Sequence, residues 1–202
     1  MAHPVPPQRT LSVADYLALE AESSVRHEYV DGQIYAMTGA TRTHNRLVAR
    51  LARLLDAACD GTDCRTHVES MRLQVAPRVF YYPDAMVVCG PEGADPLVED
   101  APSLLVEVLS PSSLVTDRVE KMTRYLALPS LAAYLIVHQE YRGVEVNVRD
   151  AGGAWTRSVL HDAGAIPLRV PPGAVLSLEA LYADLAVPTV AEARAAGAPI
   201  FD

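Results

Sequence analysis

The hydrophobic residues of this chain recur at helical spacing in several segments, of which Thr43–Cys59 is the clearest. Its apolar residues fall on one side of a helix and its arginines on the other, which predicts an amphipathic helix packed on a core. A helix is also expected over Val13–Glu22, with Thr10 or Ser12 as its cap. Two further helices are expected, over Leu114–Leu128 and from Ser177 onward.

Other segments have the pattern of strands. Val79–Cys89 and Leu104–Leu109 are nearly continuous apolar runs, which is typical of a sheet buried on both faces. Pro83 interrupts the first run and indicates an edge, a bulge or an irregular start there. Further strands are expected at Thr66–Val75 and Ala132–His138, and hairpins at Asp31-Gly32 and between 144–148 and 155–160.

The order of these elements indicates a mixed α/β or α+β fold, in which helices flank a central sheet. With 202 residues, half of them hydrophobic, the chain fits one domain over residues 11–190. The Pro-rich residues 1–10 are expected to be disordered, and residues 191–202 to form a tail. No segment has the length of a membrane span, and the N-terminus does not have the pattern of a signal peptide. We therefore expect a cytoplasmic protein with no membrane partner.

The three cysteines, an odd number without an export signal, are expected to be reduced thiols. Zinc binding by Cys59, Cys64 and His67 is the less favoured alternative, since no fourth ligand is evident.

The net charge of −8 argues against a surface built wholly for nucleic acid. The charge is uneven, however, because residues 26–78 hold eight arginines against six acids. Arg46, Arg50 and Arg53 lie on the polar face of the predicted helix. A solvated face is favoured for them over contact with DNA.

Two carboxylates stand where these apolar strands would be expected to carry hydrocarbon. Asp84 follows Pro83, and Glu107 lies inside Leu104–Leu109. A buried carboxylate needs a cation, a hydrogen-bond donor or a metal ion. Carboxylate oxygens suit Mg²⁺ or Mn²⁺. The chain has one lysine, Lys121, against sixteen arginines, which suggests a position where a compact ammonium is required. A structural ion-pair network among these residues is the alternative.

The motifs that contain these residues resemble those of the PD-(D/E)XK nuclease superfamily and, more narrowly, of the Uma-two endonuclease family. The matching stretches are His27-Glu28-Tyr29-Val30-Asp31-Gly32, His44, Tyr82-Pro83-Asp84, Val106-Glu107-Val108-Leu109-Ser110-Pro111-Ser112 and Asp117-x3-Lys121-x3-Tyr125. The chain departs from the superfamily pattern at one position. The superfamily usually has a lysine two residues after the glutamate, and this chain has Leu109 there. In the narrower family the lysine is expected on the next helix, as Lys121 is.

The resemblance implies a restriction-endonuclease-like fold and a metal-dependent endonuclease that acts on DNA. It implies that Asp84 and Glu107 are metal ligands for Mg²⁺ or Mn²⁺ and that Lys121 is the catalytic lysine. It also implies that Glu28, His44 and Tyr125 line the site. Cutting both strands with one site per chain would favour a homodimer. The alternative is a nuclease-fold module with weak or no catalysis, acting in nucleic-acid or protein binding or assembly.

Overall fold

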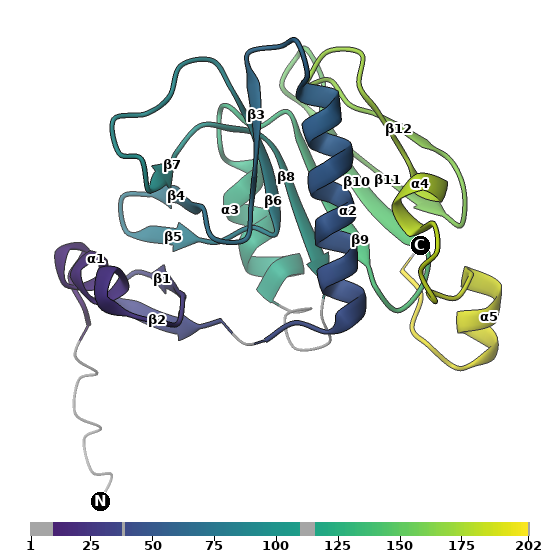
Figure 1. Cartoon of the computed structure of the whole chain (residues 1–202), viewed down its shortest axis with the longest axis horizontal. Helices are drawn as coiled ribbons and strands as arrows, with labels where there is room; N and C mark the ends of the chain where they lie inside the picture. The colour runs from purple at the N-terminus through teal and green to yellow at the C-terminus, as the bar shows by residue number, and fades with distance from the viewer. Residues whose placement is uncertain (1–9, 38, 110–115, 202) are drawn as a thin grey trace, which may run out of the picture.

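The structure is a computed structural model and describes residues 10–37, 39–109 and 116–201, with the side chains of residues 116–118 also outside the description. Its strands form two larger sheets and one small one (Figure 1). The Ser110-Pro111-Ser112 part of the motif therefore lies outside the described residues, as does the side chain of Asp117.

The six-stranded central sheet has the order β11-β10-β9-β8-β6-β3. Its strands are β3 (Cys64–Val68), β6 (Ala85–Cys89), β8 (Pro102–Leu109), β9 (Ala133–His138), β10 (Gly143–Arg149) and β11 (Trp155–His161). Strands β8 and β9 are parallel, and the other neighbours are antiparallel. This mixed sheet with flanking helices confirms the predicted fold class. The hairpin expected over residues 144–160 is also present and extends the sheet at one edge.

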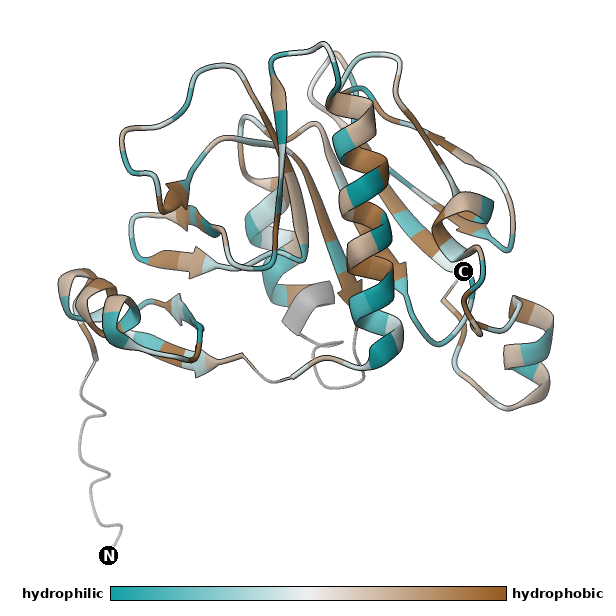
Figure 2. Ribbon diagram, viewed as in Figure 1, coloured by the Kyte–Doolittle hydropathy of each residue, from teal (hydrophilic) through white to brown (hydrophobic). Residues whose placement is uncertain are grey.

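Helices cover both faces of the central sheet. On one face lies α2 (Arg42–Cys59), whose Leu47 and Leu51 pack with Val106 and Val108 of β8. Hydrophobic and hydrophilic bands alternate along its ribbon, as expected for a helix with one apolar side (Figure 2). On the other face a π-helical turn, η1 (Thr116–Lys121), leads into α3 (Met122–Leu126). Here Tyr125 packs with Leu105 of β8. Glu107 and Leu105 point to the same face, because side chains alternate along a strand.

The five-stranded sheet has the order β2-β1-β5-β4-β7. It consists of β1 (His27–Val30), β2 (Gln33–Ala36), β4 (Arg72–Ala76), β5 (Val79–Tyr81) and β7 (Val98–Glu99). The turn between β1 and β2 is the predicted Asp31-Gly32 turn, with φ of 49° and 102°. A Cβ on Gly32 would lie 2.6 Å from Thr10 Cβ, so glycine is required for both conformation and space. Helix α1 (Val13–Glu22) covers this hairpin and is capped by Ser12.

Two expected strands are in fact pairs of strands that belong to different sheets. Thr66–Val75 divides into β3 and β4 around Glu69, whose φ of 49° reverses the chain. Val79–Cys89 divides into β5 and β6 at Tyr82-Pro83-Asp84. Proline has no N–H to donate to a ladder, so the pairing ends there and Asp84 lies between the sheets.

The C-terminal part packs beside α2, in the core on the same face of the central sheet (Figure 1). It contains β12 (Ala165–Pro167), β13 (Val175–Ser177), α4 (Leu178–Tyr182) and α5 (Val190–Ala195). Ser177 caps α4, as the sequence predicted for a helix beginning there. Residues of α5 pack against Tyr141.

Arg46 and Arg53 of α2 are exposed, as expected for a solvated face, but Arg46 and the half-buried Arg50 also contact α4 or the residues after it. Arg50 donates to the carbonyls of Ala180 and Ala183 at 2.7 and 2.9 Å, and Arg46 donates to Asp184 O at 2.9 Å. These carbonyls belong to the last turn of α4 and the residues after it, which lack helical partners. Two of the three arginines therefore fasten α4 to α2.

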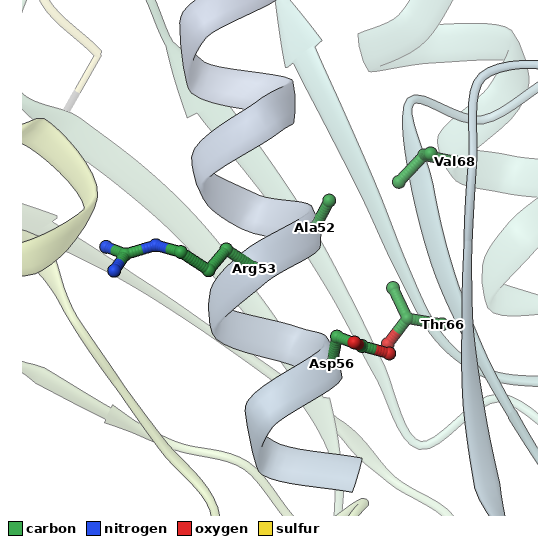
Figure 3. A pocket seen from close by; sticks show the side chains of 5 residues that line it. All are labelled: Ala52, Arg53, Asp56, Thr66 and Val68. Atoms are coloured by element: carbon green, nitrogen blue, oxygen red, sulfur yellow. The ribbon is translucent and has the colours of Figure 1, made fainter. Parts of the chain in front are cut away.

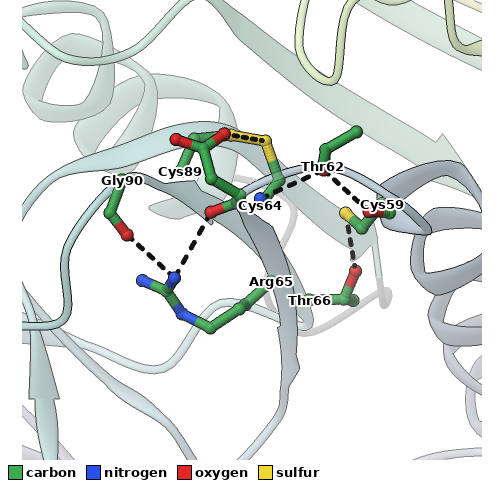
Figure 4. Close-up of a disulfide and its surroundings, with 8 residues drawn as sticks. Cys59, Thr62, Cys64, Arg65, Thr66, Cys89 and Gly90 are labelled. Atoms are coloured by element: carbon green, nitrogen blue, oxygen red, sulfur yellow. Dashed lines mark hydrogen bonds between the residues drawn. A yellow bond between two sulfur atoms is a disulfide. The ribbon is translucent and has the colours of Figure 1, made fainter.

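The expectation of three reduced thiols is wrong for two of them. Cys64 and Cys89 are directly opposite each other on β3 and β6 and form a disulfide (Figure 4). This bond removes Cys64 from any zinc site with Cys59 and His67. The thiol of Cys59 is free and buried, and its Sγ lies 3.6 Å from Thr66 Oγ1. No helix among the described residues is long and apolar enough to cross a bilayer.

Candidate active site

The strand register brings the two predicted carboxylates together. Ala85 pairs with Val106 and Met86 with Leu105, so the antiparallel ladder of β6 and β8 places Asp84 across from Glu107. The backbone N–H of Val108 donates to Asp84 Oδ2 at 2.6 Å and fixes the aspartate at the start of β6. Two acids separated by 22 residues of sequence thus become cross-strand neighbours.

His44 contacts Asp84 from the first turn of α2. Its Nε2 lies 3.3 Å from Asp84 Oδ2, and both side chains are mostly buried. Burial lowers the pKa of the His44 imidazole, but the hydrogen bond and the negative charge of Asp84 outweigh burial, so that pKa lies above its ordinary value. His44 Nδ1 is buried without a hydrogen-bond partner among the described residues.

Lys121 reaches Glu107 from η1 across the face of β8. Its Nζ lies 3.2 Å from Glu107 Oε1, and the two side chains are 8% and 4% exposed. The ammonium also lies 5.4 Å from the centre of the Tyr81 ring. A lysine on the following helix can therefore occupy the space beside the carboxylates although Leu109 stands at the usual lysine position. Lys121 ends a π-helical turn, a conformation that is rare and frequent at functional sites.

Glu28 enters the cluster from the other sheet. Its Oε1 lies 2.9 Å from Lys121 Nζ and accepts a long hydrogen bond, 3.4 Å, from the Tyr82 N–H. Lys121 therefore lies between Glu28 of β1 and Glu107 of β8. The cluster joins the N-terminal hairpin to the central sheet.

Tyr125 fixes the other side of Glu107. Its hydroxyl donates to Glu107 Oε1 at 2.8 Å, and its ring packs edge-on against Tyr81 and Tyr134. Burial raises the pKa of this phenol well above its ordinary value, and the charge of Glu107 adds to the effect. Tyr125 is consequently protonated at neutral pH, where its hydroxyl donates to Glu107.

Further residues around the site were not found from the sequence. Gln139, at the end of β9, accepts from Thr41 Oγ1 at 2.5 Å and donates to Leu109 O at 2.7 Å. Thr41 in turn accepts from the His44 N–H and caps α2. Gln139 therefore links the helix end that carries His44 to the strand that carries Glu107. The sequence contains one signal for Gln139, which is that this polar residue directly follows an apolar strand.

A second buried network lies behind Tyr82. The Tyr82 hydroxyl donates to Glu20 Oε1 at 2.9 Å and accepts from Arg72 Nε at 3.0 Å. Glu20 and Arg72 are 1% and 7% exposed, and His27 Nδ1 lies 3.0 Å from Glu20 Oε2. This network anchors the residue that precedes Pro83-Asp84 and ties α1 to the five-stranded sheet.

A shallow cavity of about 260 Å³ opens elsewhere, between α2 and the edge strand β3 (Figure 3). Ala52, Arg53 and Asp56 line it from the helix, and Thr66 and Val68 line it from the strand. None of these residues belongs to the carboxylate cluster, so we do not assign the cavity to the candidate active site.

Comparison with protein families identifies the relationship. Residues 13–181 match the model of the Uma2 family, which is described as "Putative restriction endonuclease". The chain belongs to the Uma2 family. This confirms the resemblance seen in the motifs, and the matched range includes every residue of the candidate site.

Two relatives of this chain come from Synechocystis, and both are named as uncharacterized proteins. Protein slr1290 is 35% identical over 158 residues, which cover 77% of this chain and 83% of the relative. Protein sll1609 is 34% identical over 135 residues, which cover 65% of this chain and 76% of the relative.

A solved structure shares the fold of this Uma2 chain. It is the crystal structure of a "putative nuclease belonging to DUF820" from Anabaena variabilis, with a TM-score of 0.64 and 16% identity. The match covers 85% of this chain and 97% of the other. The two chains therefore share one architecture.

The donor chemistry of the Uma2 site fits a hard divalent cation. Asp84 and Glu107 supply carboxylate oxygens from facing strand positions, and Oδ1 of Asp84 has no partner among the described residues. In the described part of the chain, no group of three or more His, Cys, Asp or Glu side chains is placed so that it could hold a metal ion, so the protein ligands would be these two carboxylates. One or two carboxylates with water and substrate phosphate are a usual set for Mg²⁺, whereas Zn²⁺ would require more protein ligands.

Proposed function

We propose that this Uma2 protein is a metal-dependent endonuclease that hydrolyses phosphodiester bonds of DNA. The observation that carries the proposal is that Asp84 and Glu107 lie across from each other on neighbouring strands and that Lys121 Nζ lies 3.2 Å from Glu107 Oε1. The family description supports a nuclease, and these residues supply the groups that phosphodiester hydrolysis requires.

Asp84 and Glu107 would hold Mg²⁺ or Mn²⁺. When bound, such an ion acidifies an attacking water and neutralises charge on the phosphate. The Val108 N–H and His44 hold Asp84 in place, and Tyr125 holds Glu107. The carboxylates are thus oriented before substrate arrives, so little reorganisation is needed at the moment of reaction.

Lys121 would act on the phosphate side of the reaction. Its ammonium is a positive point charge within hydrogen-bond distance of the Glu28 and Glu107 carboxylates, so it could orient water and stabilise the oxygens of the pentacoordinate phosphorus. Glu28 holds the ammonium from the opposite side to Glu107. This gives Glu28 a positioning role, since its contact is with the lysine.

The proposal is tested by incubating supercoiled plasmid with Mg²⁺ or Mn²⁺ and measuring nicked and linear products. Asp84→Asn and Glu107→Gln should each lower the rate by about a hundredfold or more, since they remove the charge that holds the ion. Asp56→Asn makes the same chemical change at an exposed position of α2 and should cleave like the natural protein. Cleavage by Asp84→Asn at the natural rate would contradict the mechanism.

One observation favours a second function, that of a nuclease-fold module that binds or assembles without cutting. Lys121 already balances Glu28 and Glu107, as a purely structural network would. Calorimetric titration with Mn²⁺ separates the two. Binding that Glu107→Gln abolishes supports the nuclease, and absence of binding supports the non-catalytic module.

Cleavage of both strands would require two sites, and we propose a homodimer as the cutting form. Light scattering on the protein with and without a non-cleavable DNA duplex tests this proposal. A strictly monomeric protein that linearises plasmid would contradict it.

A further inference from the structure

Tyr35 differs from every other tyrosine in the chain. The eight others are at most 2% exposed, whereas Tyr35 is 56% exposed. It is the one exposed aromatic side chain among the described residues. Met37, two residues further along the same strand direction, is 36% exposed.

The register of the hairpin places Tyr35 on the side of the candidate site. Glu28 pairs with Tyr35 and Tyr29 pairs with Ile34. Tyr29 and Ile34 pack with Tyr16 of α1, so α1 covers that face. Glu28 and Tyr35 share the opposite face, where Glu28 Oε1 lies 2.9 Å from Lys121 Nζ. Side chains directly opposite on antiparallel strands have Cβ atoms about 5 Å apart, so the Tyr35 ring stands beside the Lys121 cluster.

The same face continues to the open end of the hairpin. The Met37 N–H donates to Arg26 O at 2.9 Å, which extends the pairing beyond β1 and β2. Met37 therefore lies opposite Arg26 and on the face of Tyr35, because side chains alternate along each strand. Arg26 is exposed. From the open end toward the site, the surface presents a cation, a thioether, an aromatic ring and then the Glu28–Lys121 pair.

We propose that Tyr35 is a stacking platform for an unpaired base of a DNA strand whose phosphate lies at the Lys121 cluster. Met37 would extend the apolar platform and Arg26 would contact the adjoining backbone phosphate. The proposal rests on the proposed nuclease function and names the form of its substrate, a single-stranded or locally unpaired DNA segment.

The size and charge of the surface formed by Arg26, Tyr35 and Met37 favour a DNA base over a second copy of the chain. A second copy of the chain would need about 800 Å² per partner in a stable interface, far more than one tyrosine and one methionine expose. A single base matches one aromatic face, and base–aromatic stacking tolerates any sequence. The flanking cation complements a phosphate, and a backbone is read mainly by such charges.

The test measures binding without cleavage, in buffer with a metal chelator. Binding of a labelled single-stranded 12-mer is measured by fluorescence anisotropy. In a separate titration, a single-stranded 12-mer that contains 2-aminopurine reports stacking. Tyr35→Ala should weaken binding about tenfold and abolish the change in 2-aminopurine emission. Tyr35→Phe keeps the ring and should bind within about twofold of the natural protein. Val175→Ala, at a 60% exposed position of β13, is the control and should change neither readout.

The outcomes separate this inference from the function on which it rests. If Tyr35→Ala binds and stacks like the natural protein while plasmid cleavage still requires Asp84, the platform is wrong and the nuclease stands. If the natural protein neither binds the strand nor cuts DNA, the proposed function has failed. If Tyr35→Ala instead turns a dimer into a monomer in light scattering, the surface is a self-association site and the platform is wrong.

Discussion

At the scale of single residues, the arrangement around Lys121 decides whether the site is stable in the absence of substrate. One ammonium lies between two carboxylates, and the three side chains are 8%, 15% and 4% exposed. Two carboxylates held that close together without a cation would repel each other in a region of low solvent access. Lys121 is therefore a structural residue as well as a candidate catalytic one.

Replacing Lys121 should cost stability because its partners stay behind. Removing one member of a buried ion pair costs about 3–5 kcal/mol, and we expect Lys121→Met to lower the free energy of unfolding by that amount. Adding Glu28→Gln should recover part of the loss, because one of the two facing charges then disappears. The measurement is urea denaturation at pH 7.

A matched control is available on the same helical segment. Arg124 pairs with the more exposed Asp31 and Glu120 at 3.5 and 3.6 Å, and such pairs contribute about 0–1 kcal/mol. Arg124→Met should therefore be nearly neutral. A loss for Lys121→Met no larger than that for Arg124→Met would show that the buried cluster does not act as described.

The sequence predicts some residues of this cluster and not others, for a physical reason. Asp84 and Glu107 are conspicuous because a charge in an apolar strand is costly, and Lys121 because it is the chain's one lysine. Glu28, His44 and Tyr125 came from the resemblance to a family. Gln139 was not predicted, since its contacts with Thr41 and Leu109 span 98 and 30 residues. No local pattern reports contacts of that range.

At the scale of elements, periodicity predicts what a segment is but not which sheet it joins. Val13–Glu22, the Asp31-Gly32 hairpin and α2 follow from local spacing and caps. The sequence predicts one strand where the structure has β3 followed by β4, and one where it has β5 followed by β6, because the apolar pattern continues through each break. The break at Pro83 has a functional consequence, since it lets Asp84 stand at the junction of the two sheets.

Gln139 tests how strongly the elements around the site are coupled. Gln139→Ala would take this partner from the exposed Thr41 and from the carbonyl of the buried Leu109, and loss of a partner costs about 1–3 kcal/mol for a buried group. Since Thr41 caps α2, we expect faster hydrogen exchange in the first turn of that helix, at His44 and its neighbours. Hydrogen exchange followed by mass spectrometry measures the effect.

The control for this variant is Gln74→Ala, a half-exposed glutamine of β4, for which no side-chain hydrogen bond is found within the described residues. It should leave exchange in α2 unchanged. Equal exchange at the start of α2 in Gln139→Ala and the natural protein would show that Gln139 does not hold the helix end.

At the scale of the whole molecule, buried tyrosines span both sheets and the contacts between them. Tyr16 lies on the buried side of α1, and Tyr82 donates to Glu20 of that helix. Tyr81 and Tyr125 lie around the site, and Tyr182 joins α4 to β9 and β10. Burial raises the pKa of all five phenols above the ordinary value of 10.0. The unfolded chain releases these protons near pH 10, while the folded chain retains them.

Stability should consequently be insensitive to these groups below pH 10 and fall steeply above it. A group whose pKa is raised by folding contributes stability that is present below its unfolded pKa and is lost as pH rises. Each such tyrosine contributes a slope of about 1.4 kcal/mol per pH unit between the pKa of the unfolded phenol and that of the folded phenol. Urea denaturation followed by circular dichroism between pH 8 and 11 measures this slope.

Tyr81→Phe identifies the tyrosines as the cause of that slope. The Tyr81 hydroxyl makes one hydrogen bond, to Glu120 Oε1 at 3.1 Å, so the variant keeps the ring packing and loses little else. With one titrating phenol fewer, its stability should fall less steeply above pH 10, by about 1.4 kcal/mol per pH unit. If Tyr81→Phe and the natural protein have the same slope, alkaline unfolding has another cause, and the aromatic packing between the two sheets does not exclude water as tightly as the structure indicates.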